Sequence, residues 1–500
     1  MRQTCTVTVI PLGRKIEVAK SSLLSDAIHD LGVEFPCGGK GICGNCKVKL
    51  LDGDIDITPE HQAVLTRKAL SPQWRLACLS RIEQDITIEV AQFNNIVLAD
   101  ETLFQFAPHS GWGIAVDLGS TTIVSQLLDL STGRIQAVQT DLNPQTRYGA
   151  DIMSRISYAM QSPAAANTLK TIVREIIGSH IRQLSIQATG EIERIRIVGN
   201  SVMHHLFCGL DVTSLATYPF ESPDNSMHHF TAKELGWDSE PKLQHTQITF
   251  LPNIGSFVGS DILAGIYAAG MFTADRPRVL IDLGTNGEIA VGNRNGILCA
   301  STAAGPAFEG CNISCGMRAS TGAISSITLD GNKPDLHVIG QVEAIGICGS
   351  GLIDAIRTGI RQGLIDHNGG IQTANIELSL TDRVKLTQKD IREFQLAKAA
   401  IATGVELLLR EQKIDRADVE KFFIAGGFGN YIDLENAVKV GLLEFDPQRI
   451  IKLSNSALIG AKMFLFEEDA AIDRLLPTTS HLSLESSPAF LDVFCEKMAF

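Results

Sequence analysis

Four cysteines near the N-terminus constrain the fold of this 500-residue chain more than any other feature. Cys37, Cys43 and Cys46 have the spacing C-x5-C-x2-C, and Cys78 follows after 31 further residues. A 2Fe–2S cluster needs four thiolates, two for each iron, and plant-type clusters use a similar three-then-one arrangement. The glycines of the loop allow positive φ angles and bring backbone N–H groups close to the sulfurs: Gly38, Gly39, Gly41 and Gly44. The sequence therefore predicts that these four cysteines hold a 2Fe–2S cluster.

A zinc site and a set of buried thiols are the alternatives to a cluster. Zinc sites usually pair two short C-x2–4-C knuckles, and Cys78 has no close cysteine partner in the sequence. Four cysteines in one such pattern also argue against ordinary core thiols. The loop resembles the ferredoxin family, and its five-residue gap is that of the adrenodoxin-like variant.

The elements around this loop follow a recognisable order. Two short alternating strands flank a Pro-Leu-Gly turn, a helix follows, and further strands are predicted at residues 47–51 and 86–90. This order resembles the β-grasp ferredoxin fold. We therefore expect an α+β 2Fe–2S ferredoxin domain at residues 1–90 and a linker at residues 91–112.

A second kind of motif begins at Ile114 and occurs twice. An apolar strand ends in Asp117 and a Gly/Ser/Thr turn, and the pattern returns 165 residues later at Asp282. Such turns aim N–H groups and hydroxyls at phosphate oxygens, and a carboxylate at the strand end can hold Mg²⁺, usually through water. Hairpins use Asp and Gly freely, but two copies that each start a β-rich unit favour phosphate binding. The predicted contacts are Gly119, Ser120, Thr121, Thr122, Gly284, Thr285, Asn286, Gly287 and Glu288.

Each half of this region later passes from a helix to a strand and a small-residue turn, so the chain contains two related halves. They resemble the ASKHA superfamily of actin, sugar and acetate kinases and heat-shock ATPases, in which duplicated ribonuclease-H-like lobes clamp ATP. The resemblance implies an α/β ASKHA-type ATPase domain at residues 113–470 and a C-terminal extension at residues 471–500. It places Gly426 and Gly427 against the adenosine, Asp117 and Asp282 in catalysis, and the hinge helices at residues 198–203 and 456–461.

Three further features each allow two interpretations. A predicted helix opens on Gly349, Ser350 and Gly351, whose amides could bind an anion or whose glycines could allow close packing. Four thiols could hold a second cluster, shared across a homodimer, or could fill the core: Cys299, Cys311, Cys315 and Cys348. For His204 and His205 we favour packing over metal, since no clear thiol or carboxylate partner is nearby in the sequence.

Composition narrows the class of protein. The net charge is −13, yet the first 92 residues hold 11 basic and 11 acidic residues, so the acidic surplus lies in the remaining chain. The absence of a basic block argues against nucleic acid, and the absence of about 18 consecutive apolar residues argues against a membrane span. Eleven cysteines and a start without signal-peptide character indicate a cytoplasmic protein.

A cluster and an ATPase on one chain indicate uphill electron transfer. No flavin or nicotinamide fingerprint is present, so we expect an external low-potential donor, such as a ferredoxin or flavodoxin, and an external acceptor. ATP is useful when the acceptor's reduction potential lies below the donor's. Each difference of about 59 mV then disfavours a one-electron transfer by about 1.4 kcal/mol.

The pairing resembles the reductive activators of corrinoid proteins. This family uses ATP to return an inactivated Co(II) corrinoid protein of a methyltransferase system to Co(I). Longer members carry a middle domain, which we expect to be missing here. An activator of the 2-hydroxyacyl-CoA dehydratase type and a small-molecule kinase with a redox-sensing domain are the alternatives.

Overall fold

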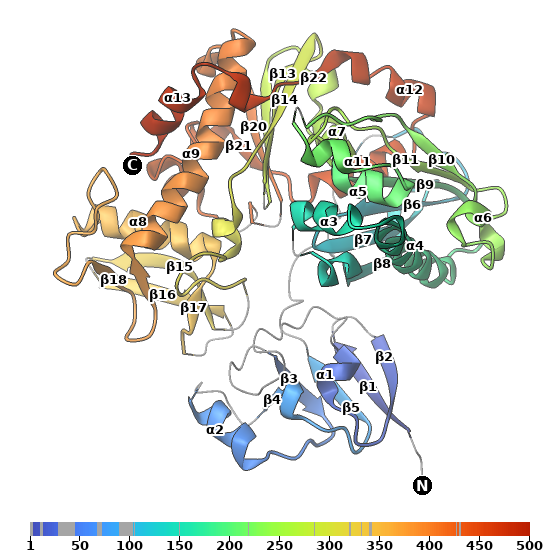
Figure 1. Ribbon diagram of the computed structural model, residues 1–500, viewed down its shortest axis with the longest axis horizontal. Coiled ribbons are helices and arrows are strands. Elements are labelled where there is room, and N and C mark those ends of the chain that lie inside the picture. Colours follow the sequence, from blue (N-terminus) through green and yellow to red (C-terminus); the bar gives the residue numbers. More distant parts are fainter. Residues whose placement is uncertain are drawn as a thin grey trace. The chain divides into compact units, whose positions relative to one another are not determined.

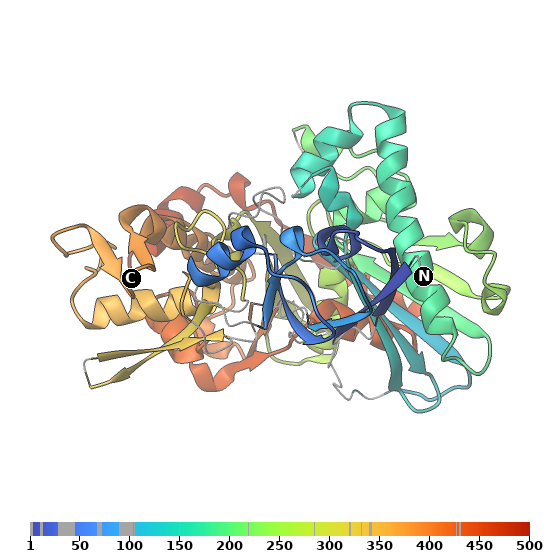
Figure 2. The ribbon, with the colours of Figure 1, turned by 90° about the horizontal axis from the view of Figure 1, so that it is seen from below.

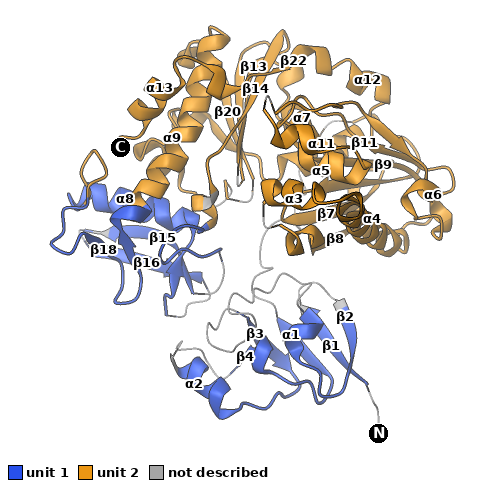
Figure 3. Ribbon diagram, viewed as in Figure 1, with its two compact units in different colours: residues 1–96, 310–364, 371–390 blue, residues 97–309, 365–370, 391–500 orange. Residues whose placement is uncertain are grey.

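The computed structural model (Figure 1) describes residues 4–10, 14–28, 46–67, 73–89, 104, 106–149, 151–218, 220–284, 286–319, 322–331, 333–339, 343–426, 428–429 and 432–500. Cys37, Cys43, Thr285 and Gly427 lie outside these residues. The chain divides into two compact units, one of residues 1–96, 310–364 and 371–390 and the other of residues 97–309, 365–370 and 391–500 (Figure 3). No helix of the described part is long and apolar enough to cross a bilayer.

The N-terminal part of the first unit forms a five-stranded sheet of order β2-β1-β5-β3-β4. β1 is antiparallel to β2 and parallel to β5, while β3 is antiparallel to both β5 and β4. The predicted alternation holds in β1, because Val7 and Val9 are buried in the core. The strands are β1 (Thr4–Ile10), β2 (Arg14–Ala19), β3 (Lys47–Asp52), β4 (Trp74–Leu76) and β5 (Ile86–Glu89), and the helices are α1 (Leu24–Ile28) and α2 (Pro59–Arg67).

The second unit contains two six-stranded sheets with the same pairing pattern. In each, the first strand is antiparallel to the second, the second is antiparallel to the third, the first is parallel to the fourth, and the fourth is parallel to the fifth. These five strands are β6 (Trp112–Leu118), β7 (Thr122–Asp129), β8 (Arg134–Leu142), β9 (Ile192–Gly199) and β11 (Gln247–Phe250) in one sheet. In the other they are β12 (Arg278–Leu283), β13 (Gly287–Asn293), β14 (Gly296–Thr302), β20 (Lys421–Ala425) and β21 (Ile450–Lys452). The duplicated α/β architecture expected from the repeated motif is therefore present.

Helices cover both faces of the first of these sheets. α4 (Pro163–Ser185) runs along β7 and β8 and is seen lengthwise in Figure 2. Alternate residues of β6 point to opposite faces, so Ile114 and Val116 join the core under α4 whereas Ala115 packs with the helices of the other face. Those helices are α7 (Ser260–Ala268) and α11 (Ser456–Phe464).

α7 and α11 cross closely because Gly460 has no side chain. A Cβ at this position would lie 2.0 Å from the backbone oxygen of Ala264. The hinge helices were predicted at residues 198–203 and 456–461, but the first of these ranges forms the end of β9 and the start of α5 (Ser201–Cys208). The helix that crosses α11 is α7, so the first prediction was wrong.

The other elements of the second unit are α3 (Ile152–Ala159), β10 (His228–Phe230), α6 (Ala232–Leu235), α10 (Leu434–Lys439), α12 (Asp469–Asp473), β22 (Thr479–His481) and α13 (Phe490–Lys497). β10 and β22 are edge strands of the two large sheets. The first unit also holds β15 (Ala323–Asp330), β16 (Lys333–Val338), β17 (Gly346–Ile347), α8 (Gly349–Arg361), β18 (Glu377–Ser379) and β19 (Lys385–Thr387), and α9 (Gln388–Glu411) begins there.

Candidate functional site

Two of the four predicted cluster ligands lie side by side in the N-terminal domain. The Sγ atoms of Cys46 and Cys78 are 3.2 Å apart and both residues are buried. Cys46 immediately precedes β3 and Cys78 follows β4, and the antiparallel pairing of these strands brings the thiols together. Two thiolates on one tetrahedral metal, with bonds of about 2.3 Å, lie about 3.7 Å apart. The two thiols therefore fit ligation of the same iron.

The two strand-end aspartates are held by adjacent residues of one helix. Asn455, the N-cap of α11, donates from Nδ2 to Asp117 Oδ2 at 2.8 Å. Its neighbour Ser456 donates from Oγ to Asp282 Oδ2 at 3.3 Å. Asp117 is the last residue but one of β6, and Asp282 is the last but one of β12, so the start of α11 connects equivalent positions of the two large sheets.

Two more acidic side chains complete a group of four carboxylates. Glu288 is directly opposite Asp282 in the β12–β13 pairing, and Asp261 lies in the first turn of α7. Burial raises the pKa of Asp117 to about 6, and burial together with the charge of Asp117 raises the pKa of Asp282 to about 6. Burial and the charge of Asp282 raise the pKa of Asp261 to about 7, and burial, Asp261 and Asp282 raise that of Glu288 well above its usual range.

All four side chains are only partly exposed, and burial disfavours the charge on each; for Asp282, Asp261 and Glu288 the neighbouring negative charges add to this cost. A hard divalent cation relieves that repulsion, and carboxylate oxygens and water are the ligands that Mg²⁺ prefers. No three of these carboxylates, all of which the structure describes, lie within 4.8 Å of one another, so the set fits Mg²⁺ that is held mainly through water. The group is asymmetric, since Asp117 faces Val124 across its hairpin where Asp282 faces Glu288.

In the turn after each aspartate, the glycine N–H donates to a backbone oxygen within the turn, and the second turn is one residue shorter. Gly119 N donates to Thr122 O at 3.1 Å, and Gly284 N donates to Asn286 O at 3.1 Å. Ser120 Oγ accepts from Asn200 Nδ2 at 2.8 Å. Both predicted phosphate turns thus begin β-hairpins beside the carboxylates, as the repeated motif indicates.

Gly426 lies against the Asp282 carboxylate. Its φ is +87°, and a Cβ there would lie 2.8 Å from Asp282 Oδ1 and 2.5 Å from Leu283 O. Only glycine fits both this conformation and this close approach. The structure therefore places Gly426 beside the carboxylate group, and its contact with the adenosine stays a prediction.

Gly349, Ser350 and Gly351 do open a helix, α8, as predicted, and the contacts that the structure describes there are those of close packing. Ser350 Oγ donates to Ser325 O at 2.7 Å. A Cβ on Gly351 would lie 2.2 Å from Ile324 O, so glycine lets α8 approach β15. An anion at this helix start stays a prediction.

The four thiols considered for a second cluster do not gather. Among the described residues, no three of Cys299, Cys311, Cys315 and Cys348 bring their sulfur atoms within metal-binding distance of one another. Cys299 is fully buried in β14 and Cys348 is the buried N-cap of α8, as the packing interpretation expects, whereas Cys311 is exposed and Cys315 is half-buried, so packing does not account for these two.

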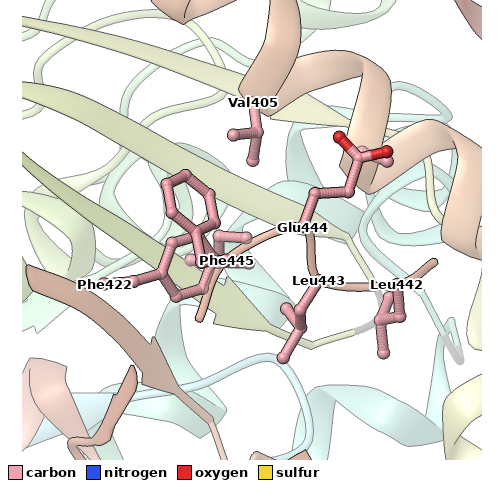
Figure 4. Close-up of a pocket in the computed structure, with 8 residues that line it drawn as sticks. Val405, Phe422, Leu442, Leu443, Glu444 and Phe445 are labelled. Atoms are coloured by element: carbon pink, nitrogen blue, oxygen red, sulfur yellow. The ribbon is translucent and has the colours of Figure 1, made fainter. Parts of the chain in front are cut away.

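A small pocket elsewhere in the second unit is lined by Ile281, Ala402, Val405, Phe422, Leu442, Leu443, Glu444 and Phe445 (Figure 4). The Glu444 carboxylate points away from the Phe422 and Phe445 rings and accepts from Lys497 Nζ at 2.7 Å. The remaining lining is apolar, so the pocket offers no donors for a phosphate.

Sequence reasoning missed Asp261 and Asn455 as members of the site. Each lies at the start of a helix that follows the fifth strand of its sheet, so the two helix starts are related by the duplication, although Asn455 is the N-cap of α11 and Asp261 is the second residue of α7. Comparing the two halves beyond their first strands would have been the signal to find them.

Comparisons with known proteins bear on both sites. Residues 7–83 match the 2Fe-2S iron-sulfur cluster binding domain, residues 112–274 match the RACo middle region, and residues 276–500 match the C-terminal domain of RACo, the ASKHA domain. The corrinoid activation enzyme RamQ of Eubacterium limosum is 34% identical to this chain, and the alignment covers 98% of each protein. The chain belongs to the family of corrinoid reductive activators.

Two further proteins with related names are also similar to this chain over most of its length. The [Co(II) methylated amine-specific corrinoid protein] reductase of Methanosarcina barkeri is 29% identical over 77% of this chain and 76% of its own. A solved reductive activator for a corrinoid, iron-sulfur protein covers 99% of this chain and 98% of its own, with 26% identity and a TM-score of 0.67. The family and the fold class predicted from the motifs are confirmed.

One expectation about the corrinoid reductive activators was wrong. The family's middle domain was expected to be missing, but residues 112–274 match the middle region. That region is the first of the two duplicated halves, containing β6 to β11 and α7. The chain therefore does not lack it.

Proposed function

We propose that this chain uses ATP to drive a single electron onto the Co(II) corrinoid of a partner methyltransferase protein and so restores Co(I). The observation that carries the proposal is the group of four carboxylates, two of which accept hydrogen bonds from the start of α11, in a chain that also pairs the Cys46 and Cys78 thiols. The names of RamQ and of the Methanosarcina barkeri reductase support the corrinoid partner.

Cys37, Cys43, Cys46 and Cys78 would hold the 2Fe–2S cluster. When bound, the cluster supplies one electron, which leaves it oxidised by one unit as Co(II) becomes Co(I). The burial of Cys46 and Cys78 keeps these two ligands away from solvent. An external low-potential donor, such as a ferredoxin or flavodoxin, would provide the next electron.

Asp117 and Asp282 would orient Mg²⁺ and its waters around the ATP phosphates, and the two hairpin turns would contact the phosphate oxygens. Because Asn455 and Ser456 join carboxylates of two different sheets, a ligand that recruits these carboxylates changes the hydrogen bonds between the sheets. A nucleotide that binds one arrangement of the sheets more tightly than another shifts their equilibrium, which is what uphill electron transfer requires.

The test is an anaerobic absorbance assay of the corrinoid protein. We expect Co(I) to accumulate only when reductant, Mg-ATP and cluster-loaded protein are all present, with each omitted in turn. Coupling between two sites is reciprocal in binding even where rates need not be, so we expect the Co(II) form of the partner to change ATP affinity and, through the same conformational change, to stimulate ATP hydrolysis. Full Co(I) formation without ATP, from a donor no stronger than a natural ferredoxin, would make this protein a plain electron carrier.

A deletion variant tested in the same assay distinguishes the proposed function from an activator of the 2-hydroxyacyl-CoA dehydratase type. A variant lacking residues 1–92 should lose all electron transfer if the N-terminal cysteines carry the cluster. An iron–sulfur absorbance that survives this deletion would favour the alternative.

A further inference from the structure

A group of metal-ligating side chains that the proposed function does not use lies on α5 and β10. One ligand atom from each of His204, Cys208 and His228 lies within 4.8 Å of the others. His204 and Cys208 are four residues apart on α5, so they project from the same face of the helix. Across the described part of the chain, this is the one such group of three or more His, Cys, Asp or Glu residues.

The buried ring of His204 has an unused nitrogen. The residue is fully buried, and Nδ1 has no hydrogen-bond partner among the described residues. Its Nε2 lies 3.2 Å from the backbone oxygen of Ser226, so Nε2 carries the proton and donates. A buried acceptor without a partner costs free energy, so the lone pair of Nδ1 needs an explanation.

The ring of His228 is oriented in the way that metal ligands usually are. Its Nε2 lies 3.1 Å from Asp224 Oδ2 and donates to it, which leaves the lone pair on Nδ1. The other oxygen of Asp224 is fixed by the N–H and hydroxyl of Ser226 at 2.8 and 2.6 Å. A carboxylate or carbonyl behind each imidazole fixes its tautomer and raises its basicity toward a metal.

The thiol of Cys208 is partly buried beside Arg174. Burial raises the pKa of the thiol, Arg174 lowers it and Asp224 raises it, with a net rise in the metal-free protein. Arg174 itself donates to Phe207 O at 2.8 Å and to Glu234 O at 3.3 Å, and it lies over the rings of Phe207 and Phe230. Its position is therefore fixed by groups other than Cys208.

We propose that His204 Nδ1, Cys208 Sγ and His228 Nδ1 bind a zinc ion, with water in a fourth position. Two imidazoles and one thiolate suit this borderline-soft ion. Tetrahedral bonds of about 2.0 Å to nitrogen and 2.3 Å to sulfur separate ligand atoms by about 3.5 Å, so atoms that lie within 4.8 Å of one another need close by at most about 1.3 Å on binding. The ion would tie the segment between α5 and β10 to the helix.

The experiment uses full-length, cluster-loaded protein, treated anaerobically with a chelator and then titrated with Zn²⁺. Bound zinc and iron are counted by elemental analysis after dialysis, and the Zn K-edge absorption spectrum, to which iron does not contribute, identifies the ligands. We expect one zinc per chain, with one sulfur at about 2.3 Å and nitrogen or oxygen ligands at about 2.0 Å. We also expect bound zinc to slow proteolysis within residues 209–227 at least tenfold.

Two variants and two matched controls decide the assignment. Cys208→Ser and His228→Asn should each weaken zinc binding at least tenfold with the iron content unchanged. His229→Asn, on the opposite face of β10, and Cys495→Ser, an exposed thiol, should leave zinc binding unchanged. Undiminished zinc in both ligand variants, or a sulfur-only ligand set, which would indicate the cluster cysteines, overturns the proposal.

Discussion

Replacing Asp282 by Asn should stabilise the protein in the absence of nucleotide while it abolishes ATP hydrolysis. Asp282 is the member of the carboxylate group whose charge raises the pKa of both Asp261 and Glu288. Asn has the same shape, and its Oδ1 can still accept from Ser456 Oγ. The substitution therefore removes one buried negative charge with little change in packing.

The magnitude follows from the pKa of Asp282, which is raised from 3.8 to about 6. The folded state holds its proton to a higher pH than the unfolded state, so stability falls as the pH rises from about 4 to about 6. At 1.36 kcal/mol for each pKa unit, the full penalty above about pH 7 is about 3 kcal/mol. The side chain keeps part of its accessible surface, so solvent screening reduces this to about 1–3 kcal/mol.

Thermal unfolding at pH 5.5 and pH 8, with and without Mg-ATP, measures the effect. Asp282→Asn should raise the Tm of the nucleotide-free protein by about 2–6 °C at pH 8 and by less at pH 5.5. Mg-ATP should then stabilise the natural protein but not the variant. Asp238→Asn, at an exposed carboxylate of the same unit, is the control and should change neither. A Tm gain that is equal at both pH values, or a loss at pH 8, would refute the electrostatic argument.

Three further changes test other parts of the molecule. Cys78→Ala should bleach the visible cluster absorbance and stop Co(I) formation, while ATP binding by equilibrium dialysis is unchanged; a native cluster in this variant would exclude Cys78 as a ligand. Asn455→Ala removes a donor that lowers the pKa of Asp117, so the acid limb of the ATPase pH–rate profile should move to higher pH, and an unmoved limb would contradict the role of that hydrogen bond. Gly351→Ala should lower the Tm by several degrees through its clash with Ile324 O, whereas a drop in ATP affinity with an unchanged Tm would instead favour anion binding there.

The sequence was most informative where a local pattern repeats. The strand, aspartate and turn at Asp117 return at Asp282, and each copy begins one of two sheets with equal pairing. Short-range chemistry is enough to predict such hairpins. The same holds for the N-terminal strands, where alternation places Val7 and Val9 in the core.

Contacts between distant segments were not predictable in this way. Asn455 reaches Asp117 across 338 residues, and Asp261 joins the carboxylates from a helix start with no motif of its own. The proposed zinc ligands show the same limit of sequence-based prediction. Cys208 was within one helical turn of His204, but His228 reaches it only through the pairing of β10 with β11. Tertiary packing of all the elements brings these distant residues into contact, and a local sequence pattern does not reveal that packing.

The four carboxylates show why a rule that acidic side chains avoid buried sites fails at this position. Four acidic side chains in one partly buried place cost stability, and no packing gain accompanies them, since each keeps some accessible surface. A sequence optimised for stability alone would replace at least one with Asn or Gln, as the Asp282→Asn prediction states. The cost is offset only when a cation and a nucleotide are bound. Binding of Mg-ATP relieves this repulsion, and the relief can favour the arrangement of the two sheets that binds the nucleotide more tightly. The element that would transmit this preference is α11, because its neighbouring residues Asn455 and Ser456 bind Asp117 and Asp282.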